Sequence, residues 1–413
     1  MDKNTAKIRV VFNDAHANLP NNKTIPQGGV SRFAERISSY FKDNHKDIEL
    51  ISLLFSHNSE NKDIYIRKTQ GARDFHELVY PREILLESYK QKFTKVEYNK
   101  FIKIFITKIS DLFKEIKPDL IFLNGFSLSN WIIMQAAHET GIPSCIQHAG
   151  LWKKELVTSG SSFSPSVKKI FSSYEKEIFK KTAHQIFLND FSRDELFKIH
   201  NLSKKVFLKK TSVIPLPIEI NKFKKISLDT KKIFEVGIVA RWDRIKNHSA
   251  AYRLAKYIKD NNLNYHINVV TKWDPSYHTD FKDKYQNIVT IVSPMSPKDL
   301  KSFYKSQDIV LIPSRFDVSP TVLMEAILQG KPVVISNNVG WVSDYKNFGI
   351  SDLVFNYTDS GEKIYRKVEK LISSKDRYLT KFNLLQKKII AHHSNKKVFE
   401  EYYKLFKSIK NVK

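Results

Sequence analysis

The chain has 413 residues, of which 41 % are hydrophobic and 12 % aromatic, and its formal net charge is +26. This length accommodates two domains with large cores, and the composition excludes an intrinsically disordered protein. The single cysteine, Cys145, excludes an internal disulfide, a cysteine-ligated metal cluster and a redox pair. The charge suits an anionic partner such as a nucleoside diphosphate, an anionic lipid surface or a nucleic acid, although a solvated lysine-rich surface would carry it equally well.

The N-terminus is polar before a short predicted strand at residues 8–12. It has no hydrophobic segment of the kind found in signal peptides, and no apolar run in the sequence is long enough to span a membrane. We therefore expect a cytoplasmic protein, with peripheral association at the inner face of the membrane as an open alternative.

A glycine pair, Gly28 and Gly29, stands before a helix that is predicted to run to Tyr40. Glycine lets a ligand approach the backbone closely, and a helix start offers free N–H groups to an anion. Taken alone, such a pair more often marks a turn. Its position after the first strand favours ligand binding.

Residues 83–117 form one or two predicted helices that carry both apolar and lysine-rich positions. One interpretation is a basic amphipathic surface that docks on anionic lipid. The other, which we favour, is a packed helix whose lysines face solvent.

Further strands of the first half are expected at 48–55, 118–123, 143–147 and 185–189. His148 stands at the end of one of them, and ligands of doubly wound sheets bind at such strand ends. A hydrogen-bonded structural histidine in a turn is an equally good interpretation.

A proline-containing joint at residues 213–219 precedes the second half of the chain, and proline stiffens such a connection. A strand at 234–239 then leads into a basic turn that contains Arg241 and, five residues later, Lys246. A fixed guanidinium and ammonium would stabilise a diphosphate leaving group as its negative charge grows. A solvated basic turn is the alternative.

The remaining strands of the second half are expected at 266–270, 288–292, 309–312 and 333–335. Between the last two, Ser319 and Pro320 are typical of a helix start, and Gly330 is typical of a helix end. This βαβ pattern predicts a parallel sheet with its ligand edge at the carboxyl ends of the strands.

That edge is predicted to hold Asp317, and Glu325 follows eight residues later inside the helix. Free backbone N–H groups between Ser319 and Leu323 favour a phosphate at the same place.

Asp317 and Glu325 form an acidic-x7-Glu pattern, which is followed by Gly-Lys-Pro-Val-Val at residues 330–334. This pattern resembles the signature of the retaining GT-B glycosyltransferases of family 4, the group 1 type. Arg241 and Lys246 match the Arg-x4-Lys spacing of that family. The likeness runs in order from Ile8 to about Ser408, with Asp317 in place of the usual Glu.

The resemblance implies an α/β fold of GT-B architecture, in which two Rossmann-like doubly wound parallel-sheet domains face a cleft. We expect an acceptor-binding domain at 1–210 and a nucleotide-sugar donor domain at 211–385. The C-terminal helices at 386–413 are expected to return to the first domain, with an apolar stripe in its core.

The resemblance also implies a hexosyltransferase that moves a sugar, with retention, from a UDP- or GDP-linked donor to a hydroxyl of a glycan or lipid-linked acceptor. Cell-surface polysaccharide or lipopolysaccharide synthesis is the expected setting. No cofactor and no metal are expected, because the sequence contains no Asp-x-Asp motif and Arg241 and Lys246 would replace the cation.

By resemblance, the catalytic residues are Arg241, Lys246, Asp317 and His148. Asp317 and His148 would orient the sugar, and Glu325 would contact the ribose. The implied donor-binding residues are Gly28, Gly29, Arg241, Lys246, Asp317, Ser319, Thr321, Val322, Leu323 and Glu325.

Two other functions stay open. The aspartate in place of glutamate and the missing glycines would also fit a non-catalytic GT-B scaffold protein. The net charge of +26 would suit a nucleic-acid-binding protein. Because the basic residues are scattered rather than gathered in a recognition motif, we expect no nucleic acid among the partners.

Overall fold

The computed structural model describes residues 7–13, 29–58, 62–71, 74–84, 95–158, 165–220, 223–228, 232–272 and 284–410. The chain divides into two compact units. The first comprises Met1–Leu156, Ser162–Pro217 and Asn395–Lys413, and the second comprises Val157–Ser161 and Ile218–Ser394. Apart from the short segment 157–161, the chain therefore passes from the first unit to the second within the segment 213–219, and it returns at residue 395.

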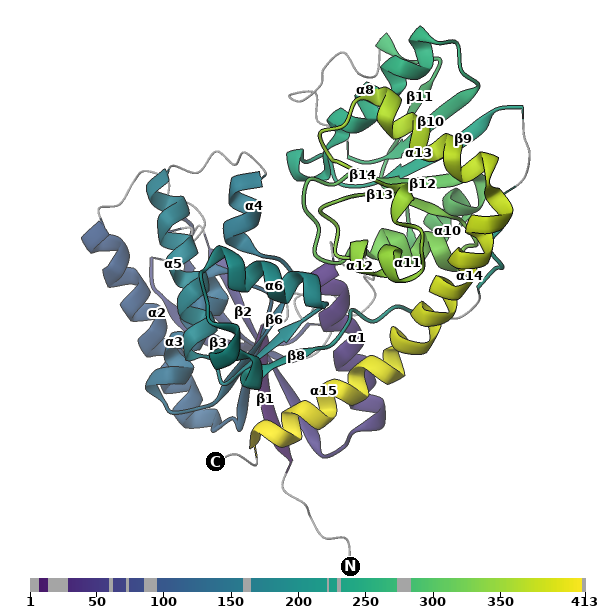
Figure 1. The fold of residues 1–413 in the computed structure, drawn as a ribbon. Coiled ribbons are helices and arrows are strands. Elements are labelled where there is room, and N and C mark those ends of the chain that lie inside the picture. The colour runs from purple at the N-terminus through teal and green to yellow at the C-terminus, as the bar shows by residue number, and fades with distance from the viewer. Residues whose placement is uncertain are drawn as a thin grey trace, which may run out of the picture. The chain divides into compact units, whose positions relative to one another are not determined.

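The first unit is built on a sheet that has eight strands in the described part of the chain (Figure 1). The strands are β1 (Ile8–Asn13), β2 (Ile48–Asn58), β3 (Tyr65–Thr69), β4 (Phe75–Pro81), β5 (Leu120–Asn124), β6 (Ser144–His148), β7 (His184–Phe187) and β8 (Thr211–Val213). Their order is β3-β4-β2-β1-β5-β6-β7-β8. All neighbours pair in parallel except β3 and β4. The winding direction reverses at β1, so this is a doubly wound sheet.

Helices surround the first sheet. They are α1 (Gly29–Asn44), η2 (Arg82–Ile84), α2 (Lys95–Ile116), α3 (Leu128–Glu139), α4 (Trp152–Thr158), α5 (Pro165–Lys181), α6 (Asp190–Ile199), α7 (Lys204–Phe207), η3 (Leu208–Lys210) and α15 (Asn395–Lys410). The apolar side of α2 lies in the core, where Phe105, Ile109 and Phe113 are at most 1 % exposed. The interpretation of α2 as an ordinary packed helix is therefore confirmed for this face.

The C-terminal helix α15 packs beside α1 in the first unit (Figure 1). Its apolar stripe, which includes Phe399, Tyr402 and Phe406, is fully buried in one cluster with residues of α1 and β1. The Phe33 ring of α1 meets the Tyr402 ring edge-on at 5.3 Å between centroids. Helix α15 thus belongs to the first unit with its stripe in the core, whereas residues 386–394 of the expected C-terminal segment lie in the second unit.

The second unit has a six-stranded sheet in the described residues, and all of its strands are parallel. The strands are β9 (Phe234–Val239), β10 (Tyr265–Val270), β11 (Val289–Val292), β12 (Ile309–Ile312), β13 (Val333–Ser336) and β14 (Val354–Phe355). Their order is β11-β10-β9-β12-β13-β14. The sheet is wound outward in both directions from β9 and β12, which are neighbours.

The helices of the second unit are η4 (Arg244–Lys246), α8 (His248–Asp260), α10 (Pro297–Ser306), α11 (Thr321–Leu328), α12 (Val342–Asn347), η5 (Ser351–Leu353), α13 (Gly361–Ser373) and α14 (Lys375–His392). The two units, each built on a largely parallel sheet, confirm the predicted α/β class of fold. All ten predicted strands are present, whereas β3, β4, β8 and β14 were not predicted.

Candidate functional site

The predicted site lies at the point where the winding of the second sheet reverses. Strands β9 and β12 are neighbours, but the helices that follow them lead the chain in opposite directions along the sheet. Ligands of doubly wound sheets bind outside the carboxyl ends of two such strands. The loop after β9 carries Arg241 and Lys246, and the loop after β12 carries Asp317.

Lys246 and Asp317 meet at this edge. The Lys246 Nζ lies 2.5 Å from the Asp317 Oδ2, and the two side chains are 22 % and 14 % exposed. The pair is therefore sheltered but still open to solvent. It combines a cation that can bind a phosphate with a carboxylate that can accept hydrogen bonds from a sugar.

Backbone contacts fix the position of Asp317. Its N–H donates to the carbonyl oxygen of Asn338 at 3.0 Å, and its own carbonyl oxygen accepts from the Gly340 N–H at 2.9 Å. These bonds form an isolated parallel bridge between Asp317 and Val339. The loop after β13 thus holds the acidic residue in place.

Arg241 extends into solvent with 78 % of its side chain exposed. One of its guanidinium nitrogens lies 3.9 Å from the Asp243 carboxylate, a weak contact near solvent. The backbone carbonyl oxygen of Arg241 contacts the His248 Nε2 at 2.8 Å, which ties the turn to the start of α8. The guanidinium is thereby available for an anion, and Lys246 rather than Arg241 makes the close contact to Asp317.

Helix α11 begins at Thr321, with Pro320 at the capping position and without a side-chain cap. The prediction that Ser319 caps this helix is therefore wrong by one residue. Proline fills the capping position here, and it has no hydroxyl with which to bind the free N–H groups. Ser319 and Leu323 are buried, while Thr321 and Val322 are partly exposed at the start of the helix. The left-handed helix end at Gly330, with φ +82°, is as predicted.

Glu325 lies one turn into α11 and is partly exposed. The Tyr304 hydroxyl at the end of α10 donates to its Oε2 at 2.8 Å. Because the Tyr304 side chain is 1 % exposed, this bond orients the carboxylate from the core side. The sequence does not predict this contact, because the pattern of the residues places Tyr304 only on the apolar face of a helix.

Asn247 is a second residue that the sequence reasoning missed. It directly follows Lys246, has a left-handed backbone conformation with φ 56° and ψ 48°, and is 1 % exposed. Its amide bonds to the loops after β12 and β14. An asparagine after a lysine in a turn carries no recognisable signal in the sequence.

The remaining predicted residues belong to the first unit. Gly28 lies outside the described residues, and Gly29 is an exposed residue at the start of α1. The His148 ring is fully buried and stacks on the Phe187 ring at 4.6 Å between centroids. Its Nε2 lies 2.7 Å from the Gln185 Oε1, and burial lowers its pKa below the usual value. The ring is hydrogen-bonded, as the structural interpretation expects, but it lies at the end of strand β6 rather than in a turn, and a catalytic role for His148 stays a prediction.

No group of three or more histidine, cysteine, aspartate or glutamate side chains in the described part of the chain could hold a metal ion. Within the same residues, no helix is both long enough and apolar enough to cross a membrane.

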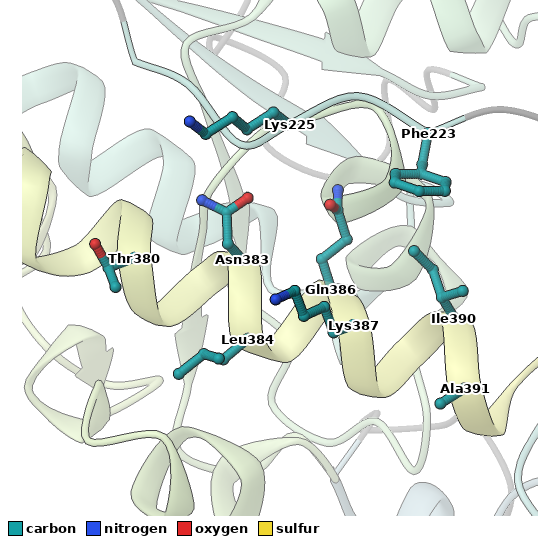
Figure 2. Close-up of a pocket in the computed structure, with 9 residues that line it drawn as sticks. All are labelled: Phe223, Lys225, Thr380, Asn383, Leu384, Gln386, Lys387, Ile390 and Ala391. Atoms are coloured by element: carbon teal, nitrogen blue, oxygen red, sulfur yellow. The ribbon is translucent and has the colours of Figure 1, made fainter.

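A surface groove of about 660 Å³ lies elsewhere in the second unit, along α14 (Figure 2). It is lined by Phe223, Lys225, Thr380, Asn383, Leu384, Gln386, Lys387, Ile390 and Ala391. The Gln386 amide donates to the carbonyl oxygens of Lys224 and Ile327, both at 2.7 Å, so it is used in holding α14 against the unit. None of the predicted site residues lines this groove.

Known proteins are similar in sequence to the second unit of this chain and similar in fold to the whole of it. The family model described as glycosyl transferases group 1 matches residues 219–383, which is nearly the whole second unit. A UDP-Gal:alpha-D-GlcNAc-diphosphoundecaprenol alpha-1,3-galactosyltransferase of Escherichia coli is 27 % identical over 163 residues, which is 34 % of this chain and 42 % of that enzyme. The matches to curated relatives span less than half of the length of those relatives.

Solved structures match over almost the full length. The sucrose-phosphate synthase of Thermosynechococcus elongatus has a TM-score of 0.71 at 15 % identity and covers 98 % of this chain and 100 % of its own. A structure titled as trehalose-6-phosphate from E. coli bound with UDP-2-fluoro glucose has a TM-score of 0.65 at 13 % identity, with coverage of 97 % and 99 %. At these identities the likeness establishes the fold. The glycosyl transferases group 1 model thus matches residues 219–383, and the resemblance to the GT-B glycosyltransferases that the sequence indicated is confirmed.

Proposed function

We propose that this protein is a glycosyltransferase that binds a nucleotide-diphosphate sugar at the β9 and β12 edge of its second unit. The observation that carries the proposal is the contact between Lys246 and Asp317 at the reversal point of the sheet. It places one cation and one carboxylate where doubly wound sheets bind nucleotides. The group 1 match to the same unit supports the proposal.

In this proposal, Lys246 and the exposed Arg241 bind the diphosphate. The bond between the sugar and the diphosphate breaks with growing negative charge on the phosphate oxygens. Cations that are fixed beforehand stabilise this charge more in the transition state than in the ground state. The free N–H groups at the start of α11 act in the same direction, since the N-terminus of a helix carries a partial positive charge.

Asp317 would accept hydrogen bonds from the hydroxyls of the sugar, and Glu325 would accept them from the ribose. The Tyr304 hydroxyl holds Glu325 from the opposite side, at 2.8 Å. Because aspartate is one methylene shorter than the glutamate usual in the family, Asp317 is the residue to which we assign an altered sugar preference.

The transfer step moves the sugar to an acceptor hydroxyl. The acceptor oxygen attacks the anomeric carbon, the bond to the diphosphate breaks, and a phosphate oxygen of the donor takes the acceptor proton. We propose retention of configuration for this step, which the family resemblance favours. UDP is our first choice of donor base, because a curated relative is named for UDP-Gal and a solved neighbour is titled as bound to UDP-2-fluoro glucose.

We propose a glycan or lipid-linked acceptor for the hydroxyl that receives the sugar. The name of the Escherichia coli relative supports a lipid-linked diphosphate sugar, since it names alpha-D-GlcNAc-diphosphoundecaprenol. Cell-surface polysaccharide or lipopolysaccharide synthesis is the setting that such an acceptor suggests.

The experiment that tests the proposal is a thermal-shift measurement on the wild type and on Lys246→Ala. Each protein is heated with UDP, GDP, ADP or CMP, with and without magnesium. A ligand that binds only the folded state raises the melting temperature. We expect UDP or GDP to stabilise the wild type without added metal, and we expect Lys246→Ala to lose this shift.

The opposite results are equally informative. If no nucleotide stabilises the wild type, the donor site is without function and a non-catalytic scaffold becomes the better assignment. If transfer from a nucleotide sugar is abolished by excess chelator, the roles given to Arg241 and Lys246 are wrong.

A further inference from the structure

We propose that Asn247 is a positioning residue of the donor site: its side chain ties three loops together and so fixes Lys246 against Asp317. The inference rests on the proposed function for the role of Lys246 in donor binding. The positioning itself is a property of the folded protein, and it can be measured without any donor.

The backbone of Asn247 marks an abrupt change of direction. The short 3-10 turn η4 ends at Lys246, and α8 starts at His248. Asn247 joins them in the left-handed conformation, with φ 56° and ψ 48°. Asparagine and glycine tolerate this conformation, whereas most other side chains are strained there. The direction in which Lys246 leaves the turn therefore depends on the residue that follows it.

The side chain of Asn247 connects this turn to two other loops at the same edge of the sheet. Its Nδ2 donates to the carbonyl oxygen of Pro313, in the loop after β12, at 2.8 Å. The same Nδ2 donates to the carbonyl oxygen of Tyr357, in the loop after β14, at 2.9 Å. Both amide hydrogens are thereby used, and the Asn247 side chain is 1 % exposed.

A second contact runs parallel to the first. The backbone N–H of Arg315 donates to the carbonyl oxygen of Ile245 at 2.7 Å, so the backbone just before Lys246 is also bound to the loop after β12. The Arg315 Nε lies 3.4 Å from the Asn247 Oδ1. The carbonyl oxygen and both hydrogens of the Asn247 amide therefore have partners.

These contacts explain how a flexible lysine is held in one place. Lys246 lies between Ile245 and Asn247, and both of these neighbours are bound to the segment Pro313–Arg315. That segment leads directly to Asp317. The amide of Asn247 thus sets the distance between the backbones that carry the cation and the carboxylate. A site that acts through electrostatic preorganisation depends on such fixed distances.

The test uses Asn247→Gly, which keeps the left-handed conformation and removes the amide. Asn262→Gly is the matched control, because Asn262 lies in the same unit, has φ 50° and is exposed. Both substitutions are made in the wild type and in Lys246→Ala. The first readout is the rate at which acetic anhydride acetylates Lys246, measured by mass spectrometry. The second is the dissociation constant of UDP, measured by calorimetry.

We expect Asn247→Gly to raise the acetylation rate of Lys246 at least threefold, because the ammonium then leaves Asp317 more often, and Asn262→Gly to leave this rate unchanged. We expect UDP binding to weaken about tenfold in Asn247→Gly when Lys246 is present. In the Lys246→Ala background, Asn247→Gly should bring no further loss of UDP binding, although it lowers the melting temperature in both backgrounds.

The inference is overturned if the acetylation rate of Lys246 is the same in Asn247→Gly and in the wild type. It is also overturned if Asn247→Gly weakens UDP binding by the same factor with and without Lys246, since Asn247 would then serve stability alone. If the wild type binds no UDP, the donor assignment fails, and the acetylation rates alone still decide whether Asn247 positions Lys246.

Discussion

The Lys246 ammonium and the Asp317 carboxylate lie 2.5 Å apart although their residues are 71 positions apart in the sequence. In the proposed function the ammonium binds the diphosphate of the donor, and the carboxylate accepts hydrogen bonds from its sugar. A diphosphate that binds Lys246 lies close to the Asp317 carboxylate, which is a second negative charge, while the ammonium has three donors and can keep its contact to Asp317. The pair therefore holds the lysine in place before binding and at the same time opposes the binding of an anion.

This opposition leads to a prediction for Asp317→Asn. Neutralising the carboxylate should tighten the binding of UDP about three- to tenfold, which corresponds to about 0.7–1.4 kcal/mol for a half-sheltered charge. The same variant should transfer sugar at least tenfold more slowly, because the sugar loses a charged acceptor for its hydroxyls. Calorimetry with UDP and steady-state kinetics with the nucleotide sugar measure the two effects.

Asp317→Glu is the matched control, since it keeps the charge and restores the residue that is usual in the family. We expect its affinity for UDP to stay within a factor of about two of the wild type, while its preference among donor sugars changes. Weaker UDP binding in Asp317→Asn would contradict the charge repulsion between the carboxylate and the diphosphate.

The second prediction separates the nucleoside part of the donor from the diphosphate. Glu325 is oriented by the Tyr304 hydroxyl, and we assign it to the ribose. Glu325→Gln should therefore weaken UDP binding about tenfold, because hydrogen bonds to a charged acceptor contribute about 1.5–3 kcal/mol. Inhibition by pyrophosphate should stay unchanged. Tyr304→Phe is the companion variant, and it should show the same selectivity with a smaller effect. Equal losses for UDP and pyrophosphate would place Glu325 at the phosphates instead.

The sequence predicts the second unit well because its elements follow local rules. The run of apolar residues in β12 is buried on both faces, and Gly330 ends the following helix in the left-handed conformation that glycine accepts. The meeting of Lys246 with Asp317 also fits the topology, since the two residues lie in the loops that follow neighbouring parallel strands. The sequence predicts the start of this helix one residue too early. Ser319 followed by Pro320 is typical of a capping serine and a first-turn proline, whereas here Pro320 itself is the capping residue.

The sequence does not predict the outer strands of the first unit. In β4, Glu77 occupies a position that is 4 % exposed, which a pattern of apolar residues cannot anticipate. It is tolerated there because Arg67 and Thr69 of the antiparallel strand β3 bind its carboxylate at 2.8 and 3.2 Å. Burial of a charge depends on such a partner, and the partner is known only once the strands are paired.

The third prediction concerns helix α15 as part of the first unit. Phe406 is fully buried among Phe41, Phe122 and Tyr402. Phe406→Ala should lower the free energy of unfolding by about 3–5 kcal/mol, since it removes a large ring from a closed core. Lys404→Ala on the exposed side of the same helix should change it by less than about 0.5 kcal/mol. Chemical denaturation followed by circular dichroism measures both. A small effect of Phe406→Ala would show that α15 is dispensable for the first unit.

The fourth prediction concerns the pH dependence of stability through His148. Burial lowers the pKa of this ring, whereas in the unfolded chain its pKa is about 6.5. Below that pH the unfolded state binds a proton that the native state does not bind, so stability falls as the pH falls. The loss reaches at most about 1.4 kcal/mol for each pH unit below 6.5, until the folded-state pKa is reached.

His148→Gln removes this titration and keeps a donor for the Gln185 Oε1. The drop in melting temperature between pH 7.5 and pH 5.5 should therefore be smaller in His148→Gln than in the wild type. A part of the drop should remain in the variant, because burial also lowers the pKa of His76 and His184. Parallel melting curves of the two proteins over this range would contradict the prediction. Transfer kinetics of His148→Gln at pH 7.5 then test the catalytic role: normal turnover would leave His148 as a packed residue of the first unit, and loss of turnover with unchanged UDP binding would favour the role at the sugar.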